Sequence, residues 1–365
     1  MMLKCFLKHE LNSKQPSVAS LTLFCQSNNK FYIGLDSKLL ILTCGRIYEQ
    51  QLGFIINCAI IISKGELLLL GLSNGELVCL DNSSFAIVWS IPIKDELPIR
   101  KLLIFHNVLL ILVGKNTLVM LYLDSLIAAS TGNELIVHDL AESACLVELP
   151  MGQVNDLKVL SKYRPWPNSY VKDEFYGPKI LLVGNNPMLS IINLPAIEEA
   201  IRDPLGMATQ FIGKKLSSWL SSSGKESPRH HYLLDIIPRA MTKPLIILDD
   251  SSRTLNSILP TAEGLVLIDS QHGRALIFHP QIGTFTRQFK GFRGAYIVTC
   301  KRSLLALYPK RNHLQIIPLT RYAHIQTIDI PKANHFYCMD NDDGLDPILL
   351  TIDDCQLKLY KLSSS

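Results

Sequence analysis

The chain has 365 residues, of which 48% are apolar and 19% charged, and its formal net charge is +4. This composition excludes extended intrinsic disorder, which requires low hydrophobicity and a high net charge. A charge of +4 spread over this length is too weak to indicate a nucleic-acid-binding protein, so no nucleic-acid partner is expected.

The hydrophobicity does not come from membrane spans. The apolar runs Leu52–Ser63 and Leu102–Gly114 are shorter than the roughly 20 residues that a spanning helix needs. The first residues carry charges without a continuous apolar core, which excludes a secretory signal. Nine cysteines without a C-x-x-C pair favour a reducing compartment. We therefore expect a cytoplasmic protein.

One unit recurs along the chain: a short apolar run, a polar turn and a second run in which apolar residues recur. Its turns, such as Ser73-Asn74-Gly75, contain Asn and Gly, which adopt positive φ readily and favour β-hairpins. The unit begins at Phe31, Leu67, Leu109, Ile180, Leu265, Leu304 and Ile348.

The spacing of these hairpins indicates the fold. Four of the six gaps between successive starts are 36–44 residues long, close to the roughly 40–45 residues of one four-stranded propeller blade. The sequence therefore predicts an all-β fold in which residues 1–365 form a single β-propeller of about seven four-stranded, WD-repeat-like blades. An irregular array of β-sandwiches is the alternative.

Two insertions account for the long gaps. Residues 163–178 are rich in Pro and aromatic residues and are predicted to form a packed loop. Residues 196–244 contain an amphipathic helical pattern followed by a Ser-rich, basic stretch. This helix is a candidate for binding a membrane or a partner; alternatively, it packs on its own propeller. Its apolar stripe consists of Ile212, Leu216, Trp219 and Leu220.

The sequence contains no catalytic or metal-binding motif. Asp340-Asn341-Asp342-Asp343-Gly344 resembles a calcium loop, but its Gly falls one position early and Thr351 stands where the bidentate Glu is needed. G-x-S-x-G, H-E-x-x-H and the phosphate-binding loop are missing. We expect no enzyme activity, metal or cofactor in this chain, and a propeller without such a site is expected to bind other proteins.

The segment Asp249–Ile297 is the most distinctive stretch of the chain. It contains an acidic residue shortly before Arg253, then a hairpin with an Asp and a Gly-Arg pair, and finally an aromatic-Lys-Gly-aromatic-Arg run. These features resemble the N-terminal region of the non-catalytic (regulatory) subunit of the Rab-three GTPase-activating complex. Its matching positions are Asp249, Arg253, Asp269, Gly273, Arg274, Gly283, Arg287, Phe289, Lys290, Gly291, Phe292 and Arg293.

The resemblance implies a role as a subunit. In that family a heterodimer accelerates GTP hydrolysis on Rab-three-type GTPases and promotes nucleotide exchange on Rab-eighteen in vesicle traffic. The GTPase-activating residues belong to the other, catalytic subunit. The resemblance therefore implies that this chain binds a catalytic subunit and, through the complex, a Rab GTPase.

The same segment suggests where a partner binds. Arg287, Lys290 and Arg293 alternate with Phe289 and Phe292, which predicts a strand with a basic outer face over an aromatic inner face. Such a face could meet an acidic patch of a partner, or it could be ordinary solvated charge.

Two other functions remain open. Phe292-Arg293-Gly294 is similar to the Phe-Arg-Arg-Gly run of phosphoinositide-binding propellers, although it has one Arg instead of two. A generic propeller scaffold in a trafficking complex is the other alternative.

Overall fold

The computed structural model describes twenty segments of the chain in two compact units. Unit 1 comprises residues 1–56 and 259–365, and unit 2 comprises residues 57–258. The described residues are 2–10, 19–25, 30–43, 46–93, 96–105, 107–130, 144–149, 151–160, 179–185, 188–192, 242–247, 255–261, 264–269, 271–279, 284–300, 303–319, 324–332, 335–339, 348–353 and 356–363.

Unit 2 holds three four-stranded sheets, each formed by consecutive strands. The first consists of β6 (Ile56–Ile62), β7 (Leu67–Leu72), β8 (Glu76–Asp81) and β9 (Ile87–Pro92). The second consists of β10 (Ile99–Phe105), β11 (Val108–Val113), β12 (Thr117–Tyr122) and β13 (Cys145–Glu148). The third consists of β14 (Val154–Leu160), β15 (Lys179–Gly184), β16 (Met188–Ile192) and β17 (Thr242–Ile247).

Unit 1 holds three complete sheets and most of a fourth. One consists of β2 (Ala19–Cys25), β3 (Lys30–Leu35), β4 (Lys38–Thr43) and β5 (Arg46–Gln51). Another consists of β18 (Ser257–Thr261), inside which the two units divide, β19 (Gly264–Asp269), β20 (Arg274–His279) and β21 (Thr284–Lys290). A third consists of β22 (Tyr296–Cys300), β23 (Ser303–Tyr308), β24 (His313–Pro318) and β25 (Gln326–Asp329).

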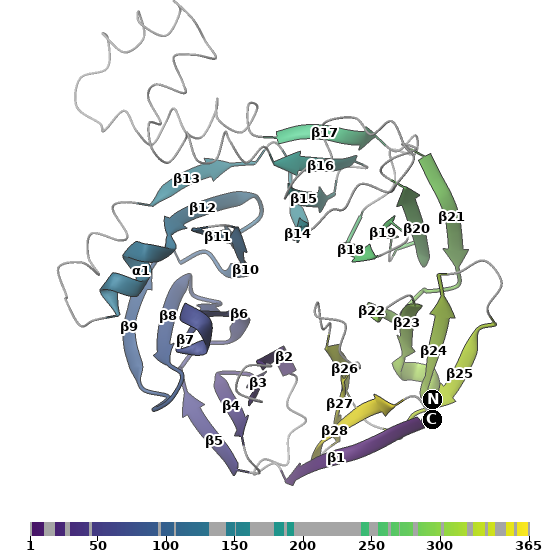
Figure 1. Ribbon diagram of the computed structural model, residues 1–365, viewed down its shortest axis with the longest axis horizontal. Coiled ribbons are helices and arrows are strands. Elements are labelled where there is room, and N and C mark those ends of the chain that lie inside the picture. The colour runs from purple at the N-terminus through teal and green to yellow at the C-terminus, as the bar shows by residue number, and fades with distance from the viewer. Residues whose placement is uncertain are drawn as a thin grey trace, which may run out of the picture. The chain divides into compact units, whose positions relative to one another are not determined.

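The remaining sheet of unit 1 combines both ends of the chain. It contains β26 (His335–Met339), β27 (Ile348–Asp353) and β28 (Gln356–Ser363), and the N-terminal strand β1 (Met2–Glu10) completes it. β1 runs antiparallel to β28, so the two ends of the chain lie side by side (Figure 1). Seven four-stranded sheets in series, with the last completed by the N-terminal strand, are the architecture of a β-propeller. The predicted fold class is confirmed.

The predicted hairpins are the two central strands of every sheet. β3–β4, β7–β8, β11–β12, β15–β16, β19–β20, β23–β24 and β27–β28 coincide with the seven recurring units of the sequence. These strands read as nearly continuous apolar runs because side chains on both of their faces are buried. All residues of β7 and β11 are buried, for example.

The sheets pack face to face within each unit. In unit 2, a core cluster containing Leu69, Trp89 and Ile111 joins β6–β9 to β10–β12, and a second cluster, containing Leu110 and Leu182, joins that sheet to β14–β15. In unit 1, similar clusters join β18–β21 to β22–β25, then β22–β25 to β27–β28, and finally β27–β28 to β3–β4. Each fully buried Leu or Ile contributes roughly 1.5–3 kcal/mol, so these contacts between sheets supply most of the stability.

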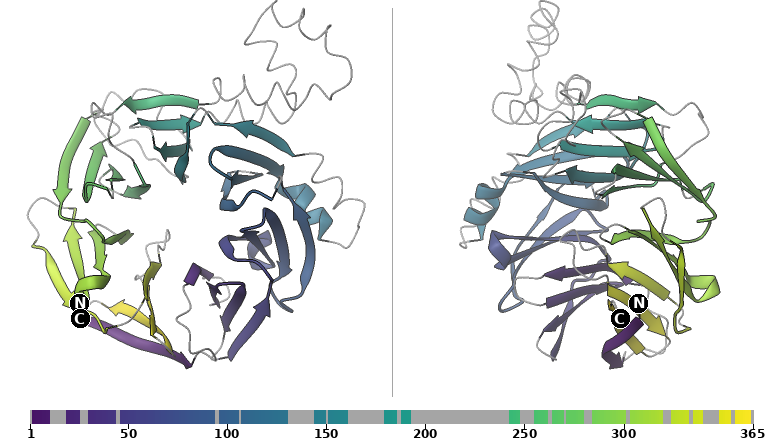
Figure 2. Two further views of the ribbon diagram at one scale, coloured as in Figure 1. Left: turned by 180° about the vertical axis from the view of Figure 1, so that it is seen from behind. Right: turned by 45° about the vertical axis from the view of Figure 1, so that its right-hand side comes forward.

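A short helix, α1 (Leu123–Ala129), follows β12 and was not predicted. It lies at the periphery of unit 2 (Figures 1 and 2), and its buried residues Leu126 and Ala129 join the cluster between the first two sheets. Seven residues with two buried positions are too few to produce a recognisable helical period. Among the described residues, no helix is long and apolar enough to span a membrane.

The two predicted insertions fall almost entirely outside the described residues. Residues 163–178 lie outside them, as do residues 196–241, which include Ile212, Leu216, Trp219 and Leu220. The last residues assigned to the second insertion, Thr242–Pro244, belong to β17.

Two buried thiols give a testable consequence of this packing. Burial raises the pKa of Cys58 and of Cys79 to about 12, whereas Cys5 is exposed. At pH 8 the buried thiols are protonated, and the thiolate is the reactive form. We expect 5,5′-dithiobis(2-nitrobenzoic acid) to modify Cys5 within minutes and to leave Cys58 and Cys79 unmodified until the protein unfolds. Peptide mapping after quenching measures this order, and equally fast modification of Cys79 would contradict it.

Candidate partner-binding site

The distinctive segment of the sequence forms much of one sheet of unit 1. Its central part is the β19–β20 hairpin and the outer strand β21, and its last part is the connection from β21 to β22. Asp249, Arg253 and Gly283 lie outside the described residues. The structure therefore places nine of the twelve signature residues.

Asp269 stabilises the β19–β20 turn from inside. Its side chain is fully buried and its Oδ1 accepts the backbone N–H of His272 at 3.1 Å. Nδ1 of His272 lies 2.9 Å from Oδ2 of the same carboxylate. Both oxygens of Asp269 thus face the turn, and the residue positions the hairpin instead of presenting a charge to a partner.

Gly273 occupies a position in this turn that only glycine fits well. Its φ is +62°, and a Cβ there would lie 2.5 Å from the backbone nitrogen of Arg293. Close approach lets the N–H of Phe292 donate to the carbonyl of Gly273 at 2.9 Å. The Gly-Arg pair and the aromatic-Lys-Gly-aromatic-Arg run are therefore two halves of one local structure.

The same hydrogen bond recurs in other sheets of the propeller. In each case an apolar residue just after the fourth strand donates its N–H to a carbonyl in the turn between the second and third strands. We call this bond the turn latch. The five described turn latches are Leu52 to Ser37, Ile93 to Gly75, Leu149 to Asn116, Phe292 to Gly273 and Ile330 to Asn312, at 2.8–3.0 Å. The turn latch is therefore a structural repeat shared by five of the sheets.

The predicted alternation of basic and aromatic residues needs correction. Arg287 and Phe289 are two residues apart on β21, so they share one face of the sheet, and the Arg287 guanidinium lies 4.7 Å from the Phe289 ring centroid. Arg287 also donates to the backbone carbonyl of Leu319 at 2.9 Å. The Arg287 side chain is therefore half-buried and packs against Phe289, and it is not part of an exposed basic face.

The aromatic residues meet the expectation of an inner layer. Phe292 is buried and its ring lies 6.4 Å from that of the partly buried Phe289. Gly291, between β21 and the latch, has a φ of +98° that lets the chain turn inward. Phe292 follows the end of β21, so its burial results from the turn and not from strand alternation.

Arg287 should accordingly matter for stability. We expect Arg287→Ala to lower the free energy of unfolding by about 1–2 kcal/mol, because it removes a cation–π contact and a hydrogen bond. Lys290→Ala, an exposed change on the same strand, should stay within about 0.5 kcal/mol. Urea denaturation measures both values, and equal effects of the two changes would contradict the assignment of Arg287 to the packed face.

Among the described residues of the segment, the exposed charges are Lys290 and Arg293, with Arg274 half-exposed beside them. Arg274 and Lys290 are direct partners in the register of β20 and β21. Arg293 lies in the turn held by the latch, next to Gly273. Of the four signature cations that the structure describes, it therefore brings three together and separates Arg287 from them.

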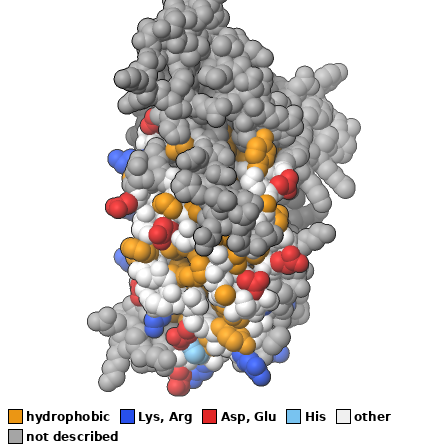
Figure 3. All heavy atoms as spheres, turned by 90° about the vertical axis from the view of Figure 1, so that its left-hand side faces the viewer, with side chains coloured by type: hydrophobic (Ala, Val, Ile, Leu, Met, Phe, Trp, Pro, Cys, Tyr) orange, Lys and Arg blue, Asp and Glu red, His pale blue; other side chains and the backbone are white. Residues whose placement is uncertain are grey.

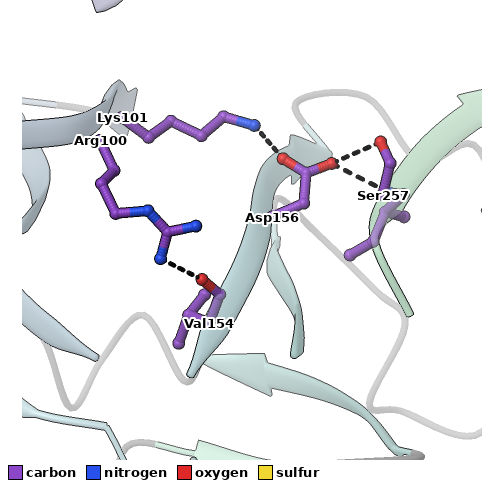
Figure 4. Close-up of polar contacts among 6 residues, drawn as sticks. Arg100, Lys101, Val154, Asp156 and Ser257 are labelled. Atoms are coloured by element: carbon purple, nitrogen blue, oxygen red, sulfur yellow. Dashed lines mark hydrogen bonds and ion pairs between the residues drawn. The ribbon is translucent and has the colours of Figure 1, made fainter. Parts of the chain in front are cut away.

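A polar cluster around the buried carboxylate of Asp156 in unit 2 was not predicted from the sequence (Figure 4). Asp156 on β14 pairs with Lys101 of β10, and its Oδ2 accepts the Ser257 hydroxyl at 2.8 Å and the Ile258 N–H at 2.9 Å. Arg100 donates to the Val154 carbonyl at 2.7 Å. One carboxylate thus links strands of three successive sheets. Because Asp156 and Ser257 are 101 residues apart, no local pattern could reveal the contact.

The described residues also leave several large hydrophobic side chains on the surface. Hydrophobic groups gather on the face that carries β9 and α1 (Figure 3). In unit 2 the exposed ones are Ile87, Leu97 and Tyr122, and Ile87 is 49% exposed. No group of three or more His, Cys, Asp or Glu that could hold a metal occurs in the described part of the chain.

Comparison with known proteins gives the fold and no family. No family model and no curated protein matches the sequence. A chain of the crystal structure of the Mitotic Checkpoint Complex is similar in structure, with a TM-score of 0.60 and 11% identity, covering 99% of this chain and 92% of that one. BBS1N, crystallised in complex with ARL6DN, has a TM-score of 0.57 and 10% identity, covering 100% of this chain and 97% of BBS1N.

A bacterial protein is similar as well. The extracellular domain of a candidate one component system from B. thetaiotaomicron has a TM-score of 0.58 and 13% identity over 99% of this chain and 40% of its own. Identities this low support the β-propeller fold alone.

Proposed function

We propose that the chain is the non-catalytic regulatory or scaffold subunit of a heterodimer that stimulates GTP hydrolysis, and promotes nucleotide exchange, on Rab GTPases in vesicle traffic. The observation that carries the proposal is the resemblance of residues 249–297 to the regulatory subunit of the Rab-three GTPase-activating complex. In this role the chain binds the catalytic subunit, acts in the cytoplasm at the surface of endomembranes, and has no enzyme activity of its own.

The geometry of the signature supports a binding role in two ways. Gly273 and Phe292 form the turn latch, and Asp269 holds the hairpin, so these residues fix the backbone of this part of the sheet. Lys290 and Arg293 are exposed on that fixed backbone. A rigid backbone with exposed charges suits recognition of a partner, since little side-chain and loop entropy is lost on binding.

Two similar structures belong to assemblies, which is compatible with this role. BBS1N was crystallised with ARL6DN, and another similar chain is part of the Mitotic Checkpoint Complex. The exposed hydrophobic residues of unit 2 offer a second surface of the kind that protein interfaces use.

Co-purification from the cells in which the chain occurs tests the proposal. We expect a tagged chain to retain a Rab GTPase-activating catalytic subunit through gel filtration at a fixed stoichiometry, with mass spectrometry identifying it. Recovery of coat or tether subunits without such a catalytic subunit would refute the proposal in favour of a generic trafficking scaffold. Tight binding to phosphoinositide vesicles, lost in Arg293→Ala, would favour the phosphoinositide-binding alternative.

A further inference from the structure

We propose that one corner of the sheet β18–β21, formed by Arg274, Lys290 and Arg293, binds a segment of a partner protein that is rich in Asp and Glu. We call these three residues the basic corner. The inference deepens the proposed function, because it rests on the chain acting as a protein-binding subunit and adds the surface and the chemistry of the partner.

The three side chains are brought together by register and by the turn latch. Arg274 is the first residue of β20 and Lys290 the last of β21, and they are direct partners in the ladder. Directly opposed side chains point to the same face with their Cβ atoms about 5 Å apart. Arg293 follows in the connection to β22, and its backbone lies against Gly273, the residue before Arg274. All three cations therefore lie at the same end of one sheet.

Among the described residues, no acidic side chain balances the charge of this corner. The nearest acidic position in the ladder is Asp269, the partner of Arg274 across β19 and β20. Its carboxylate is fully buried and both of its oxygens face His272. Within the described segments, no ion pair involves Arg274, Lys290 or Arg293. Like charges directly opposed in a sheet repel each other, so a bound carboxylate would relieve repulsion as well as form contacts.

The composition of the corner favours a protein over a membrane. An Arg guanidinium binds a carboxylate through two parallel hydrogen bonds, a geometry that a row of acidic side chains can satisfy. Tyr296, three residues beyond Arg293, is 55% exposed, and Tyr and Arg are the residues that most often carry binding energy at protein interfaces. Stable attachment to a membrane takes a lipid or an apolar anchor besides a few cations.

Matched variants distinguish binding at the basic corner from a general effect of the protein's net charge. The test variant carries Arg274→Gln, Lys290→Gln and Arg293→Gln. The control variant carries Lys4→Gln, Lys8→Gln and Arg46→Gln, which remove the same charge from exposed positions on β1 and β5 of unit 1. Arg287 stays unchanged in both, because it packs on Phe289 and its loss would confuse binding with stability. Urea denaturation of each variant checks that the fold is intact.

The probe is a fluorescein-labelled peptide of alternating Glu and Gly, with a version carrying Gln in place of Glu. By fluorescence anisotropy at low salt, we expect the intact chain and the control variant to bind the Glu peptide alike, within about twofold. The test variant should bind it about 10- to 100-fold more weakly. Binding should weaken as salt rises, because exposed charges are screened beyond about 10 Å at 0.1 M. Equal binding by the test variant, or an equal loss in the control variant, would overturn the inference.

Two further measurements distinguish a failure of this inference from a failure of the proposed function. Binding to vesicles that contain phosphatidylserine, with no binding of the Glu peptide, would overturn the inference in favour of a membrane. Assembly of the intact chain with its catalytic subunit is measured separately by gel filtration. A chain that assembles but does not bind the Glu peptide refutes only the inference, and a chain that binds the peptide but does not assemble refutes only the proposed function.

Discussion

Replacement of Asp156 by Ala is expected to lower the free energy of unfolding by about 3–5 kcal/mol. The change removes the carboxylate that pairs with Lys101 and accepts hydrogen bonds from Ser257 and Ile258. The Ile258 N–H is buried, so it loses its acceptor without gaining water in exchange. Because these contacts join three successive sheets, the loss should appear in urea denaturation as a lower midpoint of the whole of unit 2.

Two control variants sharpen this prediction. Asp156→Asn keeps one acceptor oxygen and should cost less than Asp156→Ala. Asp124→Ala removes an exposed carboxylate, which accepts one hydrogen bond from Asn107, and should stay within about 1 kcal/mol. If Asp156→Ala were as mild as Asp124→Ala, the cluster would not be the link between sheets that the structure indicates.

Replacement of Gly273 by Ala is expected to cost about 2–4 kcal/mol. A non-glycine residue at positive φ costs roughly 1–2 kcal/mol, and the added Cβ would also clash with the backbone of Arg293. The change should weaken the turn latch between Phe292 and Gly273, and with it the arrangement of the basic corner.

Gly291 provides the matched control for this change. Its φ of +98° is also positive, but no atom lies within 4 Å of a Cβ placed there. Gly291→Ala should therefore show the backbone cost alone, about 1–2 kcal/mol. Thermal and urea denaturation of the two variants measure the difference, and equal losses would show that the close approach to Arg293 contributes nothing.

The fold could be predicted from the sequence because its main signal is local. Each central hairpin is an apolar run, a turn and a second run, and strands such as β7 and β11 are buried on both faces, so the pattern is stronger than ordinary strand alternation. The outer strands gave less signal because water covers part of their surface, as in β5 with its mostly exposed residues. The helix α1 is too short for its period to be recognised.

The candidate site was predicted less completely, for physical reasons that differ between residues. Lys290 and Arg293 are exposed, whereas Arg287 is half-buried; it was assigned to the same basic face by counting alternation through the end of β21. Arg274 joins that surface through strand register, which requires knowing how β20 and β21 pair. The turn latch does have a sequence pattern that could have been found. In four of its five cases an apolar residue lies 15–19 positions after the turn residue, as Phe292 does after Gly273.

The measurement that tests the central claim most directly is single-turnover GTP hydrolysis by a Rab-three-type GTPase. The reaction is followed with the chain alone, with the catalytic subunit alone and with both. In the proposed division of roles the arginine finger belongs to the catalytic subunit. We therefore predict that the chain alone leaves the intrinsic rate unchanged, and that it changes the rate obtained with the catalytic subunit. Robust stimulation of hydrolysis by the purified chain alone would contradict the account.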